Sequence, residues 1–123
     1  MSVFRLAAAA QADIVAALAW TQERFGETAR QRYGILIATA LRDIADDPER
    51  PGSADRPELG PAVRSYHLRH SRDRAQGVEG IVRTPRHLLL YRPLTPGFIG
   101  VGRMLHDAME LSRHLPADFG GEH

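Results

Sequence analysis

The sequence predicts an α+β fold, β-α-α-β-β-β followed by a short helix, with a helical hairpin packed on one face of a mostly antiparallel sheet. Two amphipathic helical patterns follow each other in the first half of the chain, and short apolar runs with strand character fill the second half. The 123 residues are 43% hydrophobic and 25% charged, which fits one globular core. We expect a single domain over residues 1–116 and a flexible tail over 117–123.

The first half is predicted to contain a strand and two helices. Val3–Leu6 has the pattern of a short strand, and helices are expected over 10–25 and over Glu27–Asp46. Gly26 separates the helices, and so short a connection makes them antiparallel neighbours. The residues expected to face the core are Ile14, Ala17, Leu18, Thr21 and Phe25 in the first helix and Ala29, Tyr33, Leu36, Ile37, Ala40, Leu41 and Ile44 in the second.

Two large apolar residues fall outside these stripes. Trp20 lies on the flank of the first stripe, where it is either at the edge of the core, which we favour, or an anchor for a partner. Ile35 points away from the second stripe. It is either an isolated exposed residue or a partner contact.

The second half is predicted to contain a long loop and then strands. Residues 47–61 carry four prolines and few apolar residues, which favours a loop. The polar residues 69–77 are expected to form a hairpin loop or an irregular excursion, and 93–97 a turn. Strands are expected over 63–68, 81–83, 87–92 and 98–105. We expect the sheet face away from the helices to be solvated or covered by a partner.

The last strand and the residues after it carry two further expectations. Strict alternation puts Met104 on the same face as Phe98, and Arg103 on the other face with Leu105. A short helix is expected to begin at Asp107 and to end before residue 116, which is proline.

The composition excludes several kinds of chemistry. The chain has no cysteine, which rules out disulfides, thiolate catalysis and iron–sulfur clusters, and all 16 basic residues are arginine, which removes lysine chemistry. No phosphate-binding glycine loop or nucleophile elbow is present. Histidines at 67 and 70 and the His106–Asp107 pair lack a second pair at ligand spacing, so we expect neither a metal nor a cofactor. The absence of a membrane span or secretory signal favours a cytoplasmic protein.

Charge is distributed unevenly along the chain. Residues 60–116 hold nine arginines and four acidic residues, whereas residues 1–59 hold seven arginines and nine acidic residues. A basic C-terminal half predicts an acidic partner, either protein or nucleic acid. The chemistry-bearing set in this half is Arg64, Arg83, Arg86, His87, Arg103 and His106. Such a set suits either an RNA phosphate with a proton donor or the carboxylates of a protein.

One of these arginines poses a sharper question. Arg103 shares its predicted strand face with apolar residues, so its guanidinium needs a polar partner. That partner is either a residue of the same chain or a bound molecule, and the sequence leaves both open.

Four segments follow one another along the chain: the helical corner at Phe25 and Gly26, the strand Pro-Arg-His-Leu-Leu-Leu-Tyr-Arg at 85–92, the run Ile-Gly-Val-Gly-Arg-Met-Leu-His-Asp-Ala-Met-Glu at 99–110, and Arg-His-Leu at 113–115. Their order and spacing resemble the ParE toxins of the RelE/ParE superfamily, from bacterial type II toxin–antitoxin systems. The resemblance spans about residues 3–116. The family's fold agrees with the arrangement expected above, although residues 69–80 are longer and more polar than is typical of the family, which predicts an extended sheet or a flap there.

The resemblance implies a toxin that is a protein inhibitor and not an enzyme. Its target would be DNA gyrase, and its partner a ParD-like antitoxin with a ribbon-helix-helix DNA-binding domain. Operator DNA would be bound only through the toxin–antitoxin complex. The residues implied for target inhibition are Arg103, His106, Asp107, Met109, Arg113 and His114, and those expected to contact the antitoxin are Trp20, Ile35, Arg64, Arg83, Arg86 and Tyr91.

A second hypothesis comes from the other branch of the superfamily. RelE-like relatives are ribosome-dependent endoribonucleases that cleave messenger RNA with clustered basic residues. In this chain Arg64, Arg83 and His106, together with Glu79, would be the equivalent catalytic set. The absence of lysine counts against this alternative.

Overall fold

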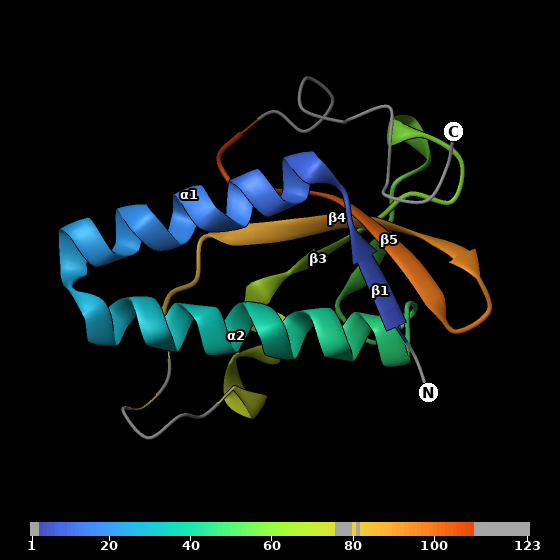
Figure 1. Cartoon of the computed structure of the whole chain (residues 1–123). Coiled ribbons are helices and arrows are strands. Elements are labelled where there is room, and N and C mark those ends of the chain that lie inside the picture. The colour runs from blue at the N-terminus through green and yellow to red at the C-terminus, as the bar shows by residue number, and fades with distance from the viewer. Residues whose placement is uncertain (1–2, 76–79, 81, 110–123) are drawn as a thin grey trace.

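The computed structural model describes residues 3–75, 80 and 82–109 and has an α+β fold. Helices α1 (Ala8–Phe25) and α2 (Glu27–Asp46) form an antiparallel hairpin that covers one face of a five-stranded sheet (Figure 1). The strand order is β1-β5-β4-β3-β2, with β1 parallel to β5 and the other pairs antiparallel. The strands are β1 (Val3–Leu6), β2 (Ser53–Asp55), β3 (Arg64–His67), β4 (His87–Thr95) and β5 (Phe98–His106). The predicted fold class is therefore confirmed.

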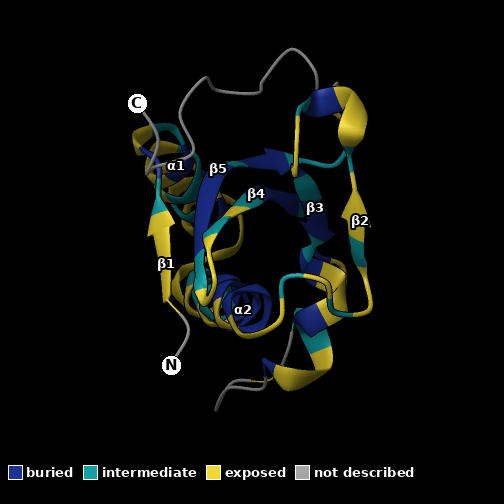
Figure 2. Cartoon of the chain, turned by 90° about the vertical axis from the view of Figure 1, so that its right-hand side faces the viewer, coloured by how far each residue is buried: buried dark blue, intermediate teal, exposed yellow. Residues whose placement is uncertain are grey.

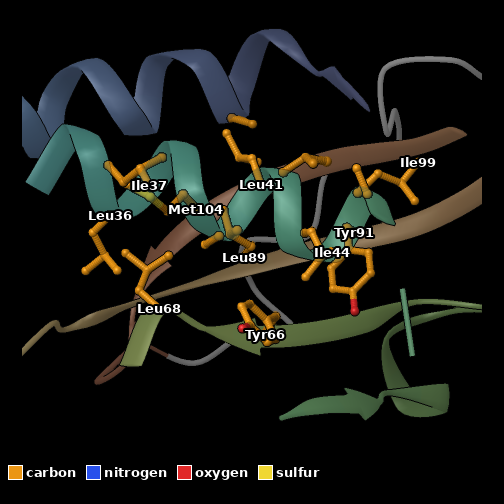
Figure 3. Close-up of a cluster of buried hydrophobic side chains, with 14 of the residues drawn as sticks. Leu36, Ile37, Leu41, Ile44, Tyr66, Leu68, Leu89, Tyr91, Ile99 and Met104 are labelled. Carbon is orange, nitrogen blue, oxygen red and sulfur yellow. The ribbon is translucent and has the colours of Figure 1, made fainter. Parts of the chain in front are cut away.

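The main core lies between α2 and the concave side of the sheet. The sheet curves around α2, with β1 and β2 on either side of it (Figure 2). Tyr66 of β3 and Leu89 of β4 are fully buried against the helix stripe, and Ile99 and Met104 of β5 extend the same cluster (Figure 3). The helical periodicity of the second stripe is confirmed, since its members from Tyr33 to Ile44 are buried.

The hairpin corner depends on a glycine. Gly26 has φ +96°, a conformation that residues with a Cβ atom rarely adopt. Its N–H donates to the carbonyl of Gln22 at the end of α1. The corner extends past the ends of the strands (Figure 1). For this reason Phe25, which we predicted to face the core, is 66% exposed, and Trp20, which we favoured as core edge, is 52% exposed.

A β-bulge in β5 corrects the predicted faces of that strand. Tyr91 pairs with Val101 whereas Leu90 pairs with Arg103, so Gly102 is an extra residue without a partner on β4. The strict alternation is broken there. Met104 therefore joins Val101 in the helix-facing core, while Leu105 lies in a separate cluster on the other face.

That second cluster corrects the expectation of an uncovered sheet face. Its members are Leu59, Val63, Leu88, Leu90 and Leu105. The segment 47–61, predicted as a loop, supplies part of this cover, because it contains β2 and the 3-10 helix Pro57–Leu59. Its prolines lie outside the three residues of β2, where they cost no ladder hydrogen bond.

Two further segments differ from the sequence prediction. Leu68–Arg74 forms a 3-10 helix packed on α2, neither a hairpin loop nor an extension of the sheet, with Leu68 and Ser71 fully buried. Val82 and Arg83 lie outside any strand, and β4 continues to Thr95, which shortens the predicted turn. The predicted final helix and tail lie outside the described residues beyond Met109.

Candidate functional site

The open side of the helical hairpin and the ends of β4 and β5 enclose a groove of about 730 Å³, here called the hairpin groove. Its floor is mostly apolar, and arginines and two imidazoles line it as well. The residues that line it are Asp13, Ala16, Ala17, Trp20, Thr21 and Phe25 of α1; Ala29, Arg32 and Tyr33 of α2; Val82, Arg83, Thr84 and Arg86; and His87, Arg103, Met104, Leu105, His106 and Met109. Open apolar surface of this kind is typical of binding sites.

One end of the groove is aromatic. The rings of Trp20 and Phe25 meet edge to face at 5.7 Å between centroids, and the guanidinium of Arg24 lies 5.4 Å from the centre of the Trp20 ring. These side chains remain largely exposed although they contact each other. The amphipathic indole ring of Trp20 is the kind of group that anchors protein partners.

A tyrosine and two histidines form the wall of the groove at the start of β4. The Tyr33 hydroxyl accepts the backbone N–H of Arg86 at 3.2 Å and donates to Nδ1 of His87 at 2.6 Å. Burial raises the pKa of Tyr33 to about 12, so it keeps the proton that it donates. Burial, assisted by the neighbouring His106, lowers the pKa of His87 to about 4, and the ring is therefore neutral at pH 7.

The second histidine has a defined tautomer as well. The rings of His87 and His106 lie edge to face at 5.5 Å. Nδ1 of His106 accepts the backbone N–H of Ala108 at 3.1 Å, so the proton of the neutral ring sits on Nε2.

Asp107 ties the end of β5 to β3 and to the segment before β4. Its carboxylate accepts two hydrogen bonds from Nε and one from Nη2 of Arg86, the shortest at 2.9 Å, and one from Nε2 of His67 at 2.9 Å. The hydrogen bonds from His67 and then Arg86 lower the pKa of Asp107 to about 2. The carboxylate is therefore ionised and engaged by the protein itself.

Arg103 also has its partner within the chain. Its Nε and Nη2 donate to the carboxylate of Asp13 in α1 at 2.6 and 2.9 Å, and this pairing raises the pKa of Arg103. The same carboxylate accepts the backbone N–H of Met104 at 3.0 Å. Asp13 thus takes the place of a neighbouring strand along the part of β5 that β1 does not reach.

Comparison with known protein families matches residues 4–111 to the ParE toxin of the type II toxin–antitoxin system, parDE. The chain belongs to the ParE toxin family. A search of curated proteins found no match. The protein is accordingly the toxin of a toxin–antitoxin pair, and its partner in that pair is an antitoxin.

The hairpin groove of the toxin unites residues from both predicted site sets. Arg103, His106 and Met109 of the predicted target-inhibition set line it, and so do Trp20, Arg83 and Arg86 of the predicted antitoxin-binding set. Asp107 lies behind the groove wall, bound to Arg86. Arg113 and His114 fall outside the described residues, as does Glu79.

Three predicted residues lie elsewhere. Tyr91 is completely buried and its hydroxyl bonds to the carbonyl of Pro48, so it cannot contact an antitoxin in the folded toxin, which corrects that prediction. Arg64 lies at the other end of β3 from His67, since Arg64 pairs with Tyr91 of β4 and His67 with Leu88. Its Nε donates to the Ser53 hydroxyl at 2.7 Å. Ile35 is 39% exposed on α2 but does not line the groove.

The positions of these residues bear on the alternative catalytic set. Arg64 pairs with Tyr91 and His106 pairs with His87, four residues apart along β4, which is about 13 Å at the rise of a strand. The structure thus brings Arg83 and His106 to one groove but not Arg64.

The sequence reasoning missed Asp13, Tyr33 and His67 as site residues. The sequence could have indicated Asp13, because it is the one charged residue between Arg5 and Glu23. Tyr33 was assigned to the core stripe, and its hydroxyl bond to β4 is a tertiary contact that periodicity does not reveal.

Two kinds of site were searched for directly within the described residues. They contain no group of three or more histidine, aspartate or glutamate side chains placed to hold a metal ion. None of the helices in this part of the chain has the length and hydropathy to cross a membrane.

Proposed function

We propose that the toxin inhibits DNA gyrase by binding it, without catalysing a reaction, and that a ParD-like ribbon-helix-helix antitoxin neutralises it by direct binding. The observation that carries this proposal is the hairpin groove, an apolar surface left open in a chain that otherwise buries its core. Burial of apolar area drives most protein association, and tryptophan and arginine dominate its energetic centres. Such a target would place the toxin in the cytoplasm.

The charges of the groove favour an acidic, amphipathic segment as the antitoxin contact. In the part of the chain that the structure describes, four arginines line it, Arg32, Arg83, Arg86 and Arg103, against one carboxylate, Asp13. Nε of Arg32 is buried and finds no hydrogen-bond acceptor within the described residues. An acidic side chain from a partner would supply one. Operator DNA would then be bound through the antitoxin's own DNA-binding domain.

The state of the ionisable groups supports inhibition over catalysis. General acid–base catalysis works best with a pKa near the operating pH, whereas the pKa of His87 is about 4 and that of Asp107 about 2. Arg103 is held by Asp13 in a bidentate pair. These groups are engaged in holding the groove together.

The test is a variant that fills the groove without disturbing the core. Ala16 is an exposed residue of α1 on the groove floor, so Ala16→Trp should block any occupant. We expect this variant to lose gyrase inhibition in a supercoiling assay. Its affinity for the antitoxin of the pair should fall by about tenfold or more. Gln22→Trp places the same side chain on an exposed position of α1 outside the groove and should behave as wild type.

The results separate the parts of the proposal. Full gyrase inhibition and antitoxin binding by Ala16→Trp would overturn the groove as the site of both. Growth arrest with unimpaired supercoiling by gyrase would overturn the target and leave the antitoxin contact standing.

Endoribonuclease activity is the second candidate, and one observation favours it. Arg83 and His106 of the predicted catalytic set both line the hairpin groove, and a guanidinium with an imidazole can hold a phosphate and shift a proton. In that case expression of the toxin would halt translation first and yield messenger RNA cleaved on the ribosome, and His106→Ala would abolish cleavage. A DNA-damage response with intact message would exclude this candidate.

A further inference from the structure

A second pocket, here called the basic pocket, lies on the sheet face away from the helices. It encloses about 450 Å³. The residues that line it are Gly52, Ala54, Arg56, Ser65, His67, Arg69, His70, Arg86, Leu88 and Asp107. Ser65 and His67 flank Tyr66 on β3, and since Tyr66 points into the helix-facing core, its two neighbours point to the opposite face. The Arg86–Asp107 pair separates this pocket from the hairpin groove.

The basic pocket has an excess of positive charge. Three guanidinium groups line it, from Arg56, Arg69 and Arg86, and Asp107 is the only acidic residue among the described residues of its wall. Asp107 is occupied by Arg86 and His67. The guanidinium of Arg69 forms no hydrogen bond or ion pair with the described residues, so its charge is uncompensated.

The two histidines of the pocket differ in their contacts. Nδ1 of His67 accepts the backbone N–H of Arg69 at 3.1 Å, so the ring proton sits on Nε2 and is donated to Asp107. Burial and the nearby charge of Arg69 lower the pKa of His70. The charge that the three arginines bring to the pocket persists across the physiological pH range.

Each arginine still has donors to offer. Nη1 of Arg86 is not among the atoms that bind Asp107. Arg56 uses Nε for the Ser65 hydroxyl at 2.9 Å and touches Glu58 only at 3.5 Å. Ser65 accepts that bond and keeps its own hydroxyl proton to donate.

We propose that the basic pocket binds a phosphate group, with Arg69, Arg56 and Arg86 as charged donors and the Ser65 hydroxyl as a neutral one. Three planar guanidinium forks from separate segments provide more N–H groups than the two oxygens of a carboxylate can use, whereas the oxygens of a phosphate can accept from all three. The group would come from a free phosphate or from the backbone of a nucleic acid. The inference is independent of what occupies the hairpin groove.

The experiment is a titration of the full-length toxin with inorganic phosphate at constant ionic strength, followed by NMR of the histidine rings and arginine Nε–H groups. We expect saturable shifts at His67, His70 and Arg69, and a rise in the pKa of His70 when the anion is bound. Arg69→Ala should weaken binding about tenfold or more, the size of one charge-assisted hydrogen bond. Arg42→Ala removes the same charge from an exposed position of α2 and should leave the affinity unchanged.

Two competitors identify the source of the group. A short single-stranded oligonucleotide that displaces phosphate and binds more tightly points to a nucleic-acid backbone, and one that fails to displace it points to a free phosphate; either result supports the pocket. Absence of saturable shifts, or equal weakening by Arg42→Ala, overturns it. Tighter binding of a polyglutamate peptide than of phosphate also overturns it, because the pocket would then be a carboxylate site.

Discussion

The buried contact of His87 predicts that the toxin loses stability in mild acid. Its pKa is about 4 in the folded protein, against about 6.5 in an unfolded chain. Because the folded pKa is the lower one, the unfolded state binds a proton more readily between these values. Stability contributed by the neutral ring is therefore complete above about pH 6.5 and is lost as the pH falls toward 4.

The size of this effect follows from the two pKa values. The gap between 6.5 and about 4 corresponds to about 3–4 kcal/mol at about 1.4 kcal/mol per pH unit. Between about pH 7 and about pH 4.5 most of it, about 2–3 kcal/mol, is lost. Physically, protonation would put a charge on a ring whose Nδ1 accepts the Tyr33 hydroxyl proton and whose neighbour is His106.

The assay is urea unfolding at these two pH values for wild type and His87→Asn. Asparagine keeps an acceptor near the position of Nδ1 but does not titrate. The comparison is of the change in the free energy of unfolding between the two pH values within each protein, so a constant loss of stability in the variant cancels. We expect wild type to lose about 2–3 kcal/mol more than the variant between the two conditions. His70→Asn, as a control, retains His87 and should keep most of the wild-type loss. Equal losses in wild type and His87→Asn would refute the reasoning.

Three other substitutions have defined expectations. Asp13→Ala removes the acceptor of Arg103 and of a β5 backbone N–H, so it should lower the free energy of unfolding by about 2–3 kcal/mol and the melting temperature by about 10 °C. Gly52→Ala should also destabilise by more than about 1 kcal/mol, because φ is +100° and the new Cβ would lie 2.5 Å from the His70 ring. Gly34→Ala should instead stabilise by about 0.5–1 kcal/mol, since Gly34 lies inside α2 and its Cβ would meet only Leu18 at 3.9 Å. Thermal and urea unfolding measure all three.

The controls for these substitutions use matched positions. Glu23→Ala removes an exposed acidic residue from α1 and should change stability by less than about 0.5 kcal/mol. If Glu23→Ala lost as much stability as Asp13→Ala, the effect of Asp13→Ala would come from the change in net charge and not from the lost hydrogen bonds. If Gly52→Ala left stability unchanged or raised it, the backbone argument for Gly52 would be wrong, and a loss of stability in Gly34→Ala would contradict the helix argument for Gly34.

Local patterns in the sequence were sufficient for the elements that pack on one face only. The stripe of α2 predicted its bounds, Glu27–Asp46, because a half-buried helix repeats its apolar residues every three to four positions. The strand β1 was predicted in the same way. The 3-10 helix Leu68–Arg74 was missed because its polar residues favour a loop, yet two of them, Ser71 and Arg74, bind a carboxylate that the sequence did not mark as buried. That carboxylate is Asp43, 4% exposed and bound by Ser71, Arg50 and Arg74.

The sequence could indicate a bulge in β5 but not the residue at which it occurs. A glycine inside a strand pattern indicates a bulge or a close approach, and this strand has two, Gly100 and Gly102. Only pairing with β4 decides which one is extra. The error moved Met104 to the wrong face and therefore hid the fact that the end of β5 forms part of the groove floor.

The pairing of Arg103 changes which variants can report on toxicity. The family resemblance placed Arg103 among the residues for target inhibition, whereas its position on an apolar strand face indicated only that its guanidinium needs a partner. The structure supplies one in Asp13, so Arg103→Ala would leave a carboxylate unpaired and weaken the contact between α1 and β5. A loss of toxicity in that variant would then reflect a damaged groove as much as a lost target contact. Ala16→Trp leaves this ion pair intact and removes only the space, so it tests the occupant of the groove directly.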